Sequence, residues 1–162
     1  EVEGEKAVFP YEPCQDDWNT QYLNRDDVKQ ALHVKTSIQW SDCSRKVHYD
    51  EKEIMKSMTG YYKWLIENSD IDMLVYSGDD DSVCSTSGTQ QWIYDLGVEP
   101  SRKNTWNPWL DNDGELAGFL TKFSKAPLSF MTVHGAGHEV PTYKPSQALL
   151  LFQKFLSREV FE

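Results

Sequence analysis

The sequence predicts an α/β fold with parallel strands between helices, and three patterns support this. Residues 71–76 form an apolar run bounded by polar turn residues, which is typical of a strand buried on both faces of a parallel sheet. Residues 51–68 and 86–96, on either side of that run, have the apolar spacing of amphipathic helices. A second apolar run at 128–134 precedes a helical pattern at 144–157. We expect functional sites at the carboxyl ends of such strands.

The N-terminal part of the chain predicts little regular structure. Residues 1–20 contain prolines and polar residues without periodicity, so we expect an extended lead-in. Asn24 is a suitable N-cap for a short helix at 25–33, where apolar residues recur at helical spacing. Residues 40–44 predict a loop.

The central part of the chain predicts a β-hairpin within residues 104–124. Two β-rich runs flank the turn sequence Asp-Asn-Asp-Gly at 111–114. The predicted packing faces are Trp92, Ile93 and Leu96 in the helix at 86–96, and Ala148, Leu149, Phe152, Phe155 and Leu156 in the last helix. No repeat or domain-sized linker interrupts the pattern, so we expect residues 1–162 to belong to one domain.

Composition and charge restrict the possible functions. The 162 residues are enough for a hydrophobic core, and six Trp, eight Tyr and seven Phe favour a folded protein. The net charge of −10 repels phosphate backbones, so we expect no nucleic-acid partner. No apolar run approaches the roughly 20 residues of a membrane span, so we expect no membrane association. The acidic start without an initiator Met predicts a processed mature chain.

A glycine-rich turn contains the first candidate functional residue. His138 lies in Gly-Ala-Gly-His-Glu-Val-Pro at 135–141, directly after the strand predicted at 128–134. The glycines permit a tight turn and the close approach of a substrate. An imidazole in this place can accept and return a proton near neutral or mildly acidic pH. The alternative is a histidine that only caps the strand.

An acidic turn, Gly-Asp-Asp-Asp at 78–81, follows the other predicted core strand. A carboxylate that accepts a hydrogen bond from one imidazole nitrogen fixes the tautomer and leaves the other nitrogen to activate a nucleophile. The chain order Asp then His is that of the last two triad members in α/β-hydrolases. The alternatives are a solvated turn or a calcium loop, but residues 82–84 do not continue the ligand spacing that calcium needs.

The nucleophile of such a triad is missing from the sequence. The chain contains neither a Gly-x-Ser-x-Gly elbow nor a glycine-rich oxyanion loop. Ser-Thr-Ser-Gly at 85–88 is the nearest candidate, but it opens a predicted helix. The sequence therefore supplies a base and its orienting acid without the attacking group.

Four longer motifs, spread over nearly the whole chain, make this pattern more specific. They are residues 22–33, Trp-Ser-Asp-Cys-Ser at 40–44, Val-Tyr-Ser-Gly-Asp-Asp-Asp at 75–81 and Thr-Val-His-Gly-Ala-Gly-His-Glu-Val-Pro at 132–141. Together they resemble the C-terminal part of a serine carboxypeptidase, a family of α/β-hydrolases active at acidic pH. The resemblance implies a serine-type hydrolase that releases C-terminal residues from peptides. It also implies that residues 1–162 form the C-terminal part of one catalytic domain, whose sheet a partner chain completes.

The resemblance also implies roles for the acidic turn and the histidine turn. Asp81 is the expected catalytic acid and His138 the expected base, with Asp79 and Asp80 as supporting or solvent-exposed groups. His134 departs from the family pattern, because many members have arginine there, and its role is open.

Two further residues are implied to contact substrate. Glu139 matches a glutamate that, in plant-type members, belongs to a carboxyl cluster holding the terminal carboxylate of the peptide. Shared protons in such a cluster explain binding at low pH, and the alternative is an exposed acid. Cys84 resembles a free thiol in the substrate pocket of yeast-like and lysosomal members. We expect no cofactor and no metal.

The resemblance implies a second polypeptide. Many relatives are cut into two disulfide-linked chains, and the start at Glu1 looks like the residue after such a cut. Cys14 and Cys43 are then expected to form disulfides with a larger N-terminal chain of the same precursor, which would contain the serine. Relatives of this kind are vacuolar, lysosomal or secreted, and a homodimer of the two-chain unit is compatible with the family.

Three alternative functions stay open at this point. An acyltransferase or a hydroxynitrile lyase of the same family can retain the Asp and the His. A non-enzymatic acidic binding module predicts instead that the chain folds alone as a monomer, although half a sheet would leave strand edges and apolar faces bare.

Overall fold

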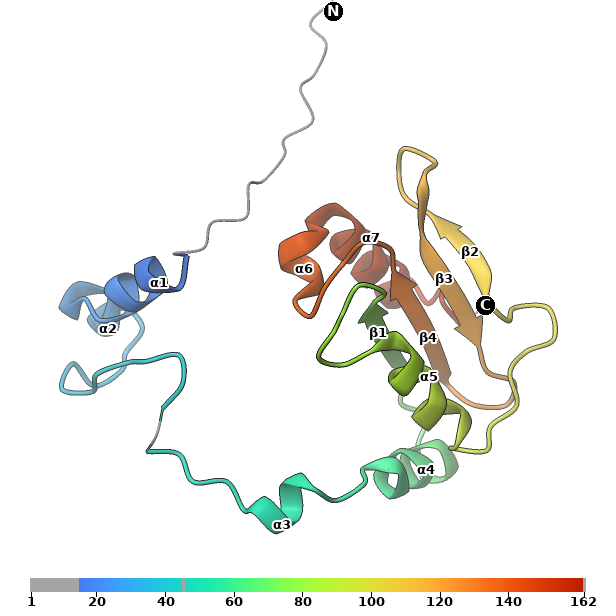
Figure 1. Cartoon of the computed structure of the whole chain (residues 1–162), viewed down its shortest axis with the longest axis horizontal. Helices are drawn as coiled ribbons and strands as arrows, with labels where there is room; N and C mark the ends of the chain where they lie inside the picture. Colours follow the sequence, from blue (N-terminus) through green and yellow to red (C-terminus); the bar gives the residue numbers. More distant parts are fainter. Residues whose placement is uncertain (1–14, 45, 162) are drawn as a thin grey trace, which may run out of the picture. The chain divides into compact units, whose positions relative to one another are not determined.

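The computed structural model describes residues 15–44 and 46–161 of the chain (Figure 1). By its internal contacts the chain divides into two units, Glu1–Lys56 and Ser57–Glu162, and each is described by itself. The assignment of the whole chain to one domain stays a prediction. Among the described residues, no helix has the length and apolar character to cross a membrane.

The described residues of the first unit, 15–44 and 46–56, form three helices: α1 (Gln15–Leu23), α2 (Asp26–Ala31) and α3 (Glu51–Ile54). The helix predicted at 25–33 is confirmed as α2, whereas the extended lead-in predicted to residue 20 is wrong from residue 15 onward. Asn24 is not the N-cap of α2, which begins after Arg25. Its side chain instead accepts a hydrogen bond from Trp40 N (2.8 Å) and donates to Trp40 O (2.9 Å). Asn24 therefore anchors the predicted loop at 40–44.

The single helix predicted at 51–68 is wrong, because the structure has two helices there, α3 and α4 (Thr59–Asn68). Between them, the Ser57 hydroxyl lies 2.8 Å from the Thr59 hydroxyl and accepts a hydrogen bond from Thr59 N. Such side-chain bonds compete with helical backbone bonds. The predicted end of the helix is confirmed, since Ser69 N donates to Leu65 O (3.0 Å) just beyond α4.

The second unit is built on a four-stranded sheet with the order β1-β4-β3-β2 (Figure 1). Strand β1 (Met73–Gly78) is parallel to β4 (Leu128–Val133), and β3 (Leu116–Lys122) is antiparallel to both β4 and β2 (Asn107–Leu110). These pairings confirm the predicted parallel strands and the predicted hairpin. All six residues of β4 are buried.

Helices lie on both faces of this sheet (Figure 1). Side chains alternate along β4, so that Leu128 and Phe130 belong to a core cluster with Ile93 of α5 (Thr86–Tyr94). Met131 and Val133 belong to a second cluster, with residues of α6 (Val140–Tyr143) and α7 (Pro145–Leu156). The inward positions predicted for the helix at 86–96 are confirmed. Ile93 of α5 and Leu96, just beyond the end of α5, are buried, and Trp92 packs beside them.

The face predicted for the last helix is partly wrong. Leu151 is the buried residue of α7, with Ala148, Leu150 and Phe155 packed against the same cluster. Leu149, Phe152 and Leu156, predicted to face inward, are exposed. The apolar face of α7, largely opposite its polar residues, is broader than the part that meets this sheet. Periodicity therefore identified the apolar face but not which part of it is covered.

Candidate active site

The candidate site lies where two adjacent parallel strands end. Gly78, the last residue of β1, is in register with Val133, the last residue of β4. The turns that follow are tied together by backbone hydrogen bonds from Asp79 N to Val133 O (3.1 Å) and from Asp80 N to Ala136 O (3.0 Å). The acidic turn (78–81) and the histidine turn (135–141) are therefore held against each other by the backbone.

Glycines make this close approach feasible. A Cβ atom at Gly78 would lie 2.2 Å from Ala136 O and 2.5 Å from Gly137 O, both backbone atoms. Gly135 has a φ of 67°, in the left-handed region that favours glycine. These two glycines allow the histidine turn to fold back over the end of β1.

Asp81 and His138 are brought together by this arrangement. Asp81 Oδ2 lies 3.0 Å from His138 Nδ1. The side chain of Asp81 is only 6% exposed, whereas that of His138 is 55% exposed. Asp81 Oδ1 accepts hydrogen bonds from Val83 N (2.7 Å) and Cys84 N (3.0 Å). The Asp81 carboxylate thus has partners on both oxygens.

The surroundings of Asp81 keep it ionised. The Cys84 N–H and then the His138 imidazole hold the pKa of Asp81 below its ordinary range. An ionised carboxylate can only accept, so Nδ1 of the imidazole carries the proton and donates it. In the neutral imidazole, Nε2 of His138 then has a free lone pair, as a general base requires.

A second carboxylate–imidazole pair lies beside the first and was not predicted from the sequence. His134 Nδ1 lies 2.7 Å from Asp79 Oδ2, and Asp79 Oδ1 accepts a hydrogen bond from Gly135 N (2.7 Å). The Asp79 side chain is 30% exposed and that of His134 is 64% exposed. A signal for this pair was present, since Asp79 and His134 directly follow the two strands as the structure bounds them.

The other predicted site residues differ in how closely they approach the Asp81–His138 pair. Cys84 is exposed, and its thiol belongs to a cluster with Asp81 and His138 in which one ligand atom of each residue lies within 4.8 Å of the others. Glu139 is exposed beside His138, and its backbone carbonyl accepts hydrogen bonds at the start of α6. Cys43 is an exposed thiol in the first unit. Cys14 lies outside the described residues.

Ser85, the nearest sequence candidate for a nucleophile, has a structural function. It is the N-cap of α5, and its hydroxyl accepts a hydrogen bond from Gly88 N (3.2 Å). This is ordinary helix capping.

A family model described as serine carboxypeptidase matches residues 2–158 of the chain. The chain belongs to the serine carboxypeptidase family. This membership makes the chain part of a hydrolase family of the α/β type, as the sequence predicted, and confirms the resemblance found in the four motifs.

Known members of the serine carboxypeptidase family are similar along most of the chain. Serine carboxypeptidase-like 26 of Arabidopsis thaliana is 37% identical over 152 residues, which are 92% of this chain and 32% of that protein. Serine carboxypeptidase II-1 of Hordeum vulgare is 35% identical, over 96% of this chain and 48% of that protein. Lysosomal protective protein of Mus musculus is 34% identical, over 86% and 30%. The chain therefore spans about a third to a half of these relatives.

A solved structure has the same fold. The prohormone-processing carboxypeptidase Kex1(delta)p of Saccharomyces cerevisiae superimposes with a TM-score of 0.69, at 21% sequence identity, over 88% of this chain and 32% of that one. The four-stranded sheet with its helices thus corresponds to part of a larger α/β fold.

Proposed function

We propose that this chain is the smaller chain of a two-chain serine carboxypeptidase and supplies Asp81 and His138 of a Ser-Asp-His triad. The enzyme releases C-terminal residues from peptides at acidic pH. The observation that carries this proposal is the 3.0 Å contact between a nearly buried carboxylate, Asp81, and an exposed imidazole, His138. Family membership supports it.

In this proposal a serine of the partner chain attacks the scissile carbonyl. His138 Nε2 takes the serine proton, and Asp81 stabilises the imidazolium that forms. The imidazolium then gives its proton to the leaving amine, and an acyl-enzyme remains. In the second half of the reaction, His138 takes a proton from water as the water attacks the acyl group, and then returns a proton to the serine. The lowered pKa of Asp81 suits acidic conditions, because the carboxylate stays ionised where an ordinary carboxyl group begins to take up a proton.

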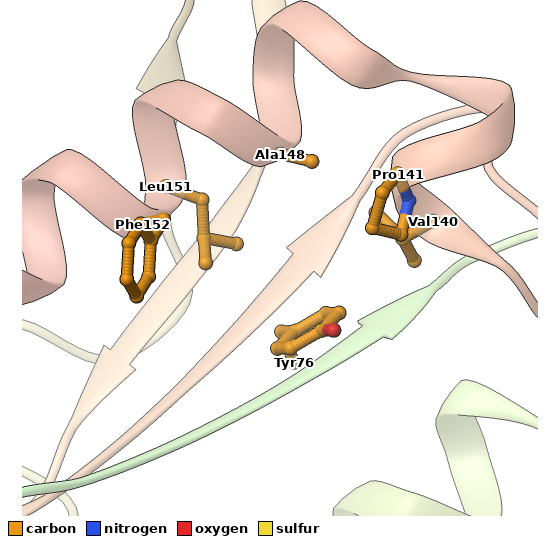
Figure 2. Close-up of a pocket in the computed structure, with 6 residues that line it drawn as sticks. All are labelled: Tyr76, Val140, Pro141, Ala148, Leu151 and Phe152. Atoms are coloured by element: carbon orange, nitrogen blue, oxygen red, sulfur yellow. The ribbon is translucent and has the colours of Figure 1, made fainter. Parts of the chain in front are cut away.

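The uncovered surface of the second unit supports a partner chain. Among the described residues, β1 pairs only with β4, so its other edge is open. Tyr76 of β1 is 47% exposed and lines an apolar hollow of about 200 Å³ (Figure 2). Figure 2 shows its ring facing Pro141 and Val140 of α6 and Leu151 of α7. An unpaired apolar edge strand of this kind requires cover in a stable protein.

Four further residues have roles in the same proposed assembly. Cys14 and Cys43 form disulfides with the larger N-terminal chain, and the exposure of Cys43 is compatible with this. Glu139 is exposed next to His138, and Cys84 is exposed near Asp81 and His138, so both are placed to contact the peptide in this proposal. A lysosomal, vacuolar or secreted location suits both the disulfides and the acidic working range.

Substrate hydrolysis by the native protein tests the function. At mildly acidic pH, a blocked dipeptide should be hydrolysed, whereas glucose esters with an acyl acceptor and cyanohydrins should react slowly or not at all. The order of these rates separates the peptidase from the acyltransferase and lyase alternatives. Non-reducing electrophoresis tests the assembly, because a larger species that reduction converts into this chain is expected. Migration as a single small chain under both conditions contradicts the two-chain proposal.

A further inference from the structure

One residue of α6, Tyr143, contacts the backbone on both sides of His138. A Cβ atom at Gly137 would lie 3.1 Å from Cε2 and 3.4 Å from Cζ of Tyr143, so the ring packs against that face of the glycine. The N–H of Tyr143 donates a hydrogen bond to Glu139 O (3.2 Å). Tyr143 thus holds the residue before His138 with its ring and the residue after it with its backbone.

Gly137 has a second close neighbour at the end of β1. A Cβ atom at Gly78 would lie 2.5 Å from Gly137 O, so the two backbones are in direct contact. Gly78 begins the acidic turn that carries Asp81. Gly137 is therefore packed both against the turn of the catalytic acid and against the ring of Tyr143, and close packing restricts the movement of this backbone.

Helix α6 is itself fixed to the core. Val140, its first residue, is buried and belongs to the same core cluster as Val133 of β4. Glu139 O accepts a second hydrogen bond, from Thr142 N (2.8 Å), at the start of the helix. Tyr143 therefore acts on the histidine turn from an anchored element, while its own side chain is 46% exposed.

We infer that Tyr143 is a positioning residue for His138 in the reaction proposed above, on which this role rests. The His138 ring is exposed, and Asp81 restrains it only through Nδ1. The direction of Nε2 therefore depends on the backbone that carries the ring, and Tyr143 limits the movement of that backbone. A displacement of about 1 Å at a reacting group can lower a rate by about 100-fold.

The atoms of Tyr143 that approach Gly137 are ring carbons, Cε2, Cζ and Cδ2. The inferred role therefore requires the aromatic ring and not the hydroxyl group. Phenylalanine should replace Tyr143 in this role, whereas alanine, which keeps the backbone hydrogen bond to Glu139, should not.

The test measures kcat and KM on the blocked dipeptide, and the rate at which a serine-directed fluorophosphonate labels the native protein. Labelling needs an activated serine but no peptide. Tyr143→Ala should lower kcat and the labelling rate by about 10- to 100-fold, with KM changed less than about 3-fold. Tyr143→Phe should restore both rates to within about 3-fold of the unmodified protein. Thr142→Ala, the matched control on α6, keeps its N–H and should leave both rates unchanged.

Gly137→Ala tests the same contact from the other side. Its Cβ atom would meet the Tyr143 ring at 3.1 Å and displace it, so kcat should fall by about 3- to 10-fold. In the Tyr143→Ala background the atoms that this Cβ meets are absent, so Gly137→Ala should cause little further loss. Losses that multiply fully in the double variant overturn the inference.

The remaining outcomes also decide. Equal rates in Tyr143→Ala and the unmodified protein refute the inference alone. A rise in KM with unchanged labelling assigns Tyr143 to peptide contact, and a thermal midpoint of Tyr143→Ala below the assay temperature assigns it a structural role; either result overturns the inference. An unmodified protein that neither hydrolyses the dipeptide nor takes up the label refutes the proposed function, and with it the reaction in which Tyr143 has this role.

Discussion

Two carboxylate–imidazole pairs of identical composition stand at the ends of β1 and β4, and their surroundings differ. The Asp81 side chain is 6% exposed, whereas that of Asp79 is 30% exposed. The second oxygen of Asp81 accepts from its own turn, at Val83 and Cys84. The second oxygen of Asp79 accepts from Gly135 in the opposite turn.

This difference indicates two separate tasks. The contacts of Asp81 with Val83 and Cys84 hold its ionised carboxylate in place within the acidic turn. The carboxylate can therefore orient the ring of His138, which lies in the neighbouring histidine turn. The contacts of Asp79 connect the two turns through both His134 and Gly135, so this pair fixes the distance between them. Shielding a carboxylate from water strengthens its effect on a neighbouring imidazole. The account therefore predicts that equal substitutions in the two pairs have unequal effects.

The largest expected effect is that of replacing the base. His138→Ala should lower kcat by about 10⁴-fold or more, because the proton of the nucleophile then has no acceptor. The matched variant His134→Ala should lower kcat by less than about 10-fold, since a solvent-exposed carboxylate–imidazole contact contributes about 1 kcal/mol at most. Steady-state kinetics on a blocked dipeptide measure both. Equal losses in the two variants would contradict the assignment of His138.

The next largest effect concerns the two carboxylates. Asp81→Asn should lower kcat by about 10⁴-fold, because the amide no longer fixes the imidazole tautomer. Asp79→Asn keeps one carbonyl oxygen that can accept from the Gly135 N–H, so its kcat should fall by less than about 10-fold. The ratio of the two kcat values is the readout. A greater loss for Asp79→Asn would reverse the roles given to the pairs.

A third effect concerns the close contact that supports both pairs. Gly78→Ala places a Cβ atom 2.2 Å from Ala136 O, so the turns must separate and the free energy of unfolding should fall by about 3 kcal/mol or more. Gly60→Ala is the matched control, since a Cβ atom there meets nothing within 4 Å. Thermal unfolding of the native protein compares the two variants. An unchanged midpoint for Gly78→Ala contradicts the described packing of the turns.

The smallest expected effect is the pH dependence of stability that arises from Asp81. Its pKa is lowered in the folded protein, so its stabilising contribution is complete above the ordinary aspartate pKa of about 3.9. The contribution disappears as the pH falls through the lowered folded value. The stability advantage of the unmodified protein over Asp81→Asn should therefore shrink below about pH 4. Denaturant unfolding at several pH values measures it, and an advantage that grows as the pH falls contradicts the assigned shift.

The sequence predicted those parts of the fold that follow from local pattern. The β1 and β4 runs, the hairpin and α5 were identified because each has a clear period and clear turn residues. The break between α3 and α4 was missed because helical apolar spacing continues across it, from Ile54 through Met58 to Tyr61. The exposure of Leu149, Phe152 and Leu156 of α7 was missed because periodicity identifies an apolar face but not how much of it a neighbouring element covers.

Prediction of the candidate site had a similar limit. Asp81 and His138 were singled out through strand ends and family resemblance, and the structure adds their separation and burial. The pairing of Asp79 with His134 was missed, because it depends on the register of β1 with β4 and on the tight packing at Gly78. Neither register nor packing can be obtained from periodicity alone.

Covalent labelling tests the central claim most directly. The native protein is treated with a serine-directed fluorophosphonate, and the modified peptide is identified by mass spectrometry. The account predicts a label on one serine outside residues 1–162, in a separate chain, which His138→Ala abolishes and His134→Ala leaves in place. A label on a serine within these 162 residues, or labelling that persists in His138→Ala, would contradict the account.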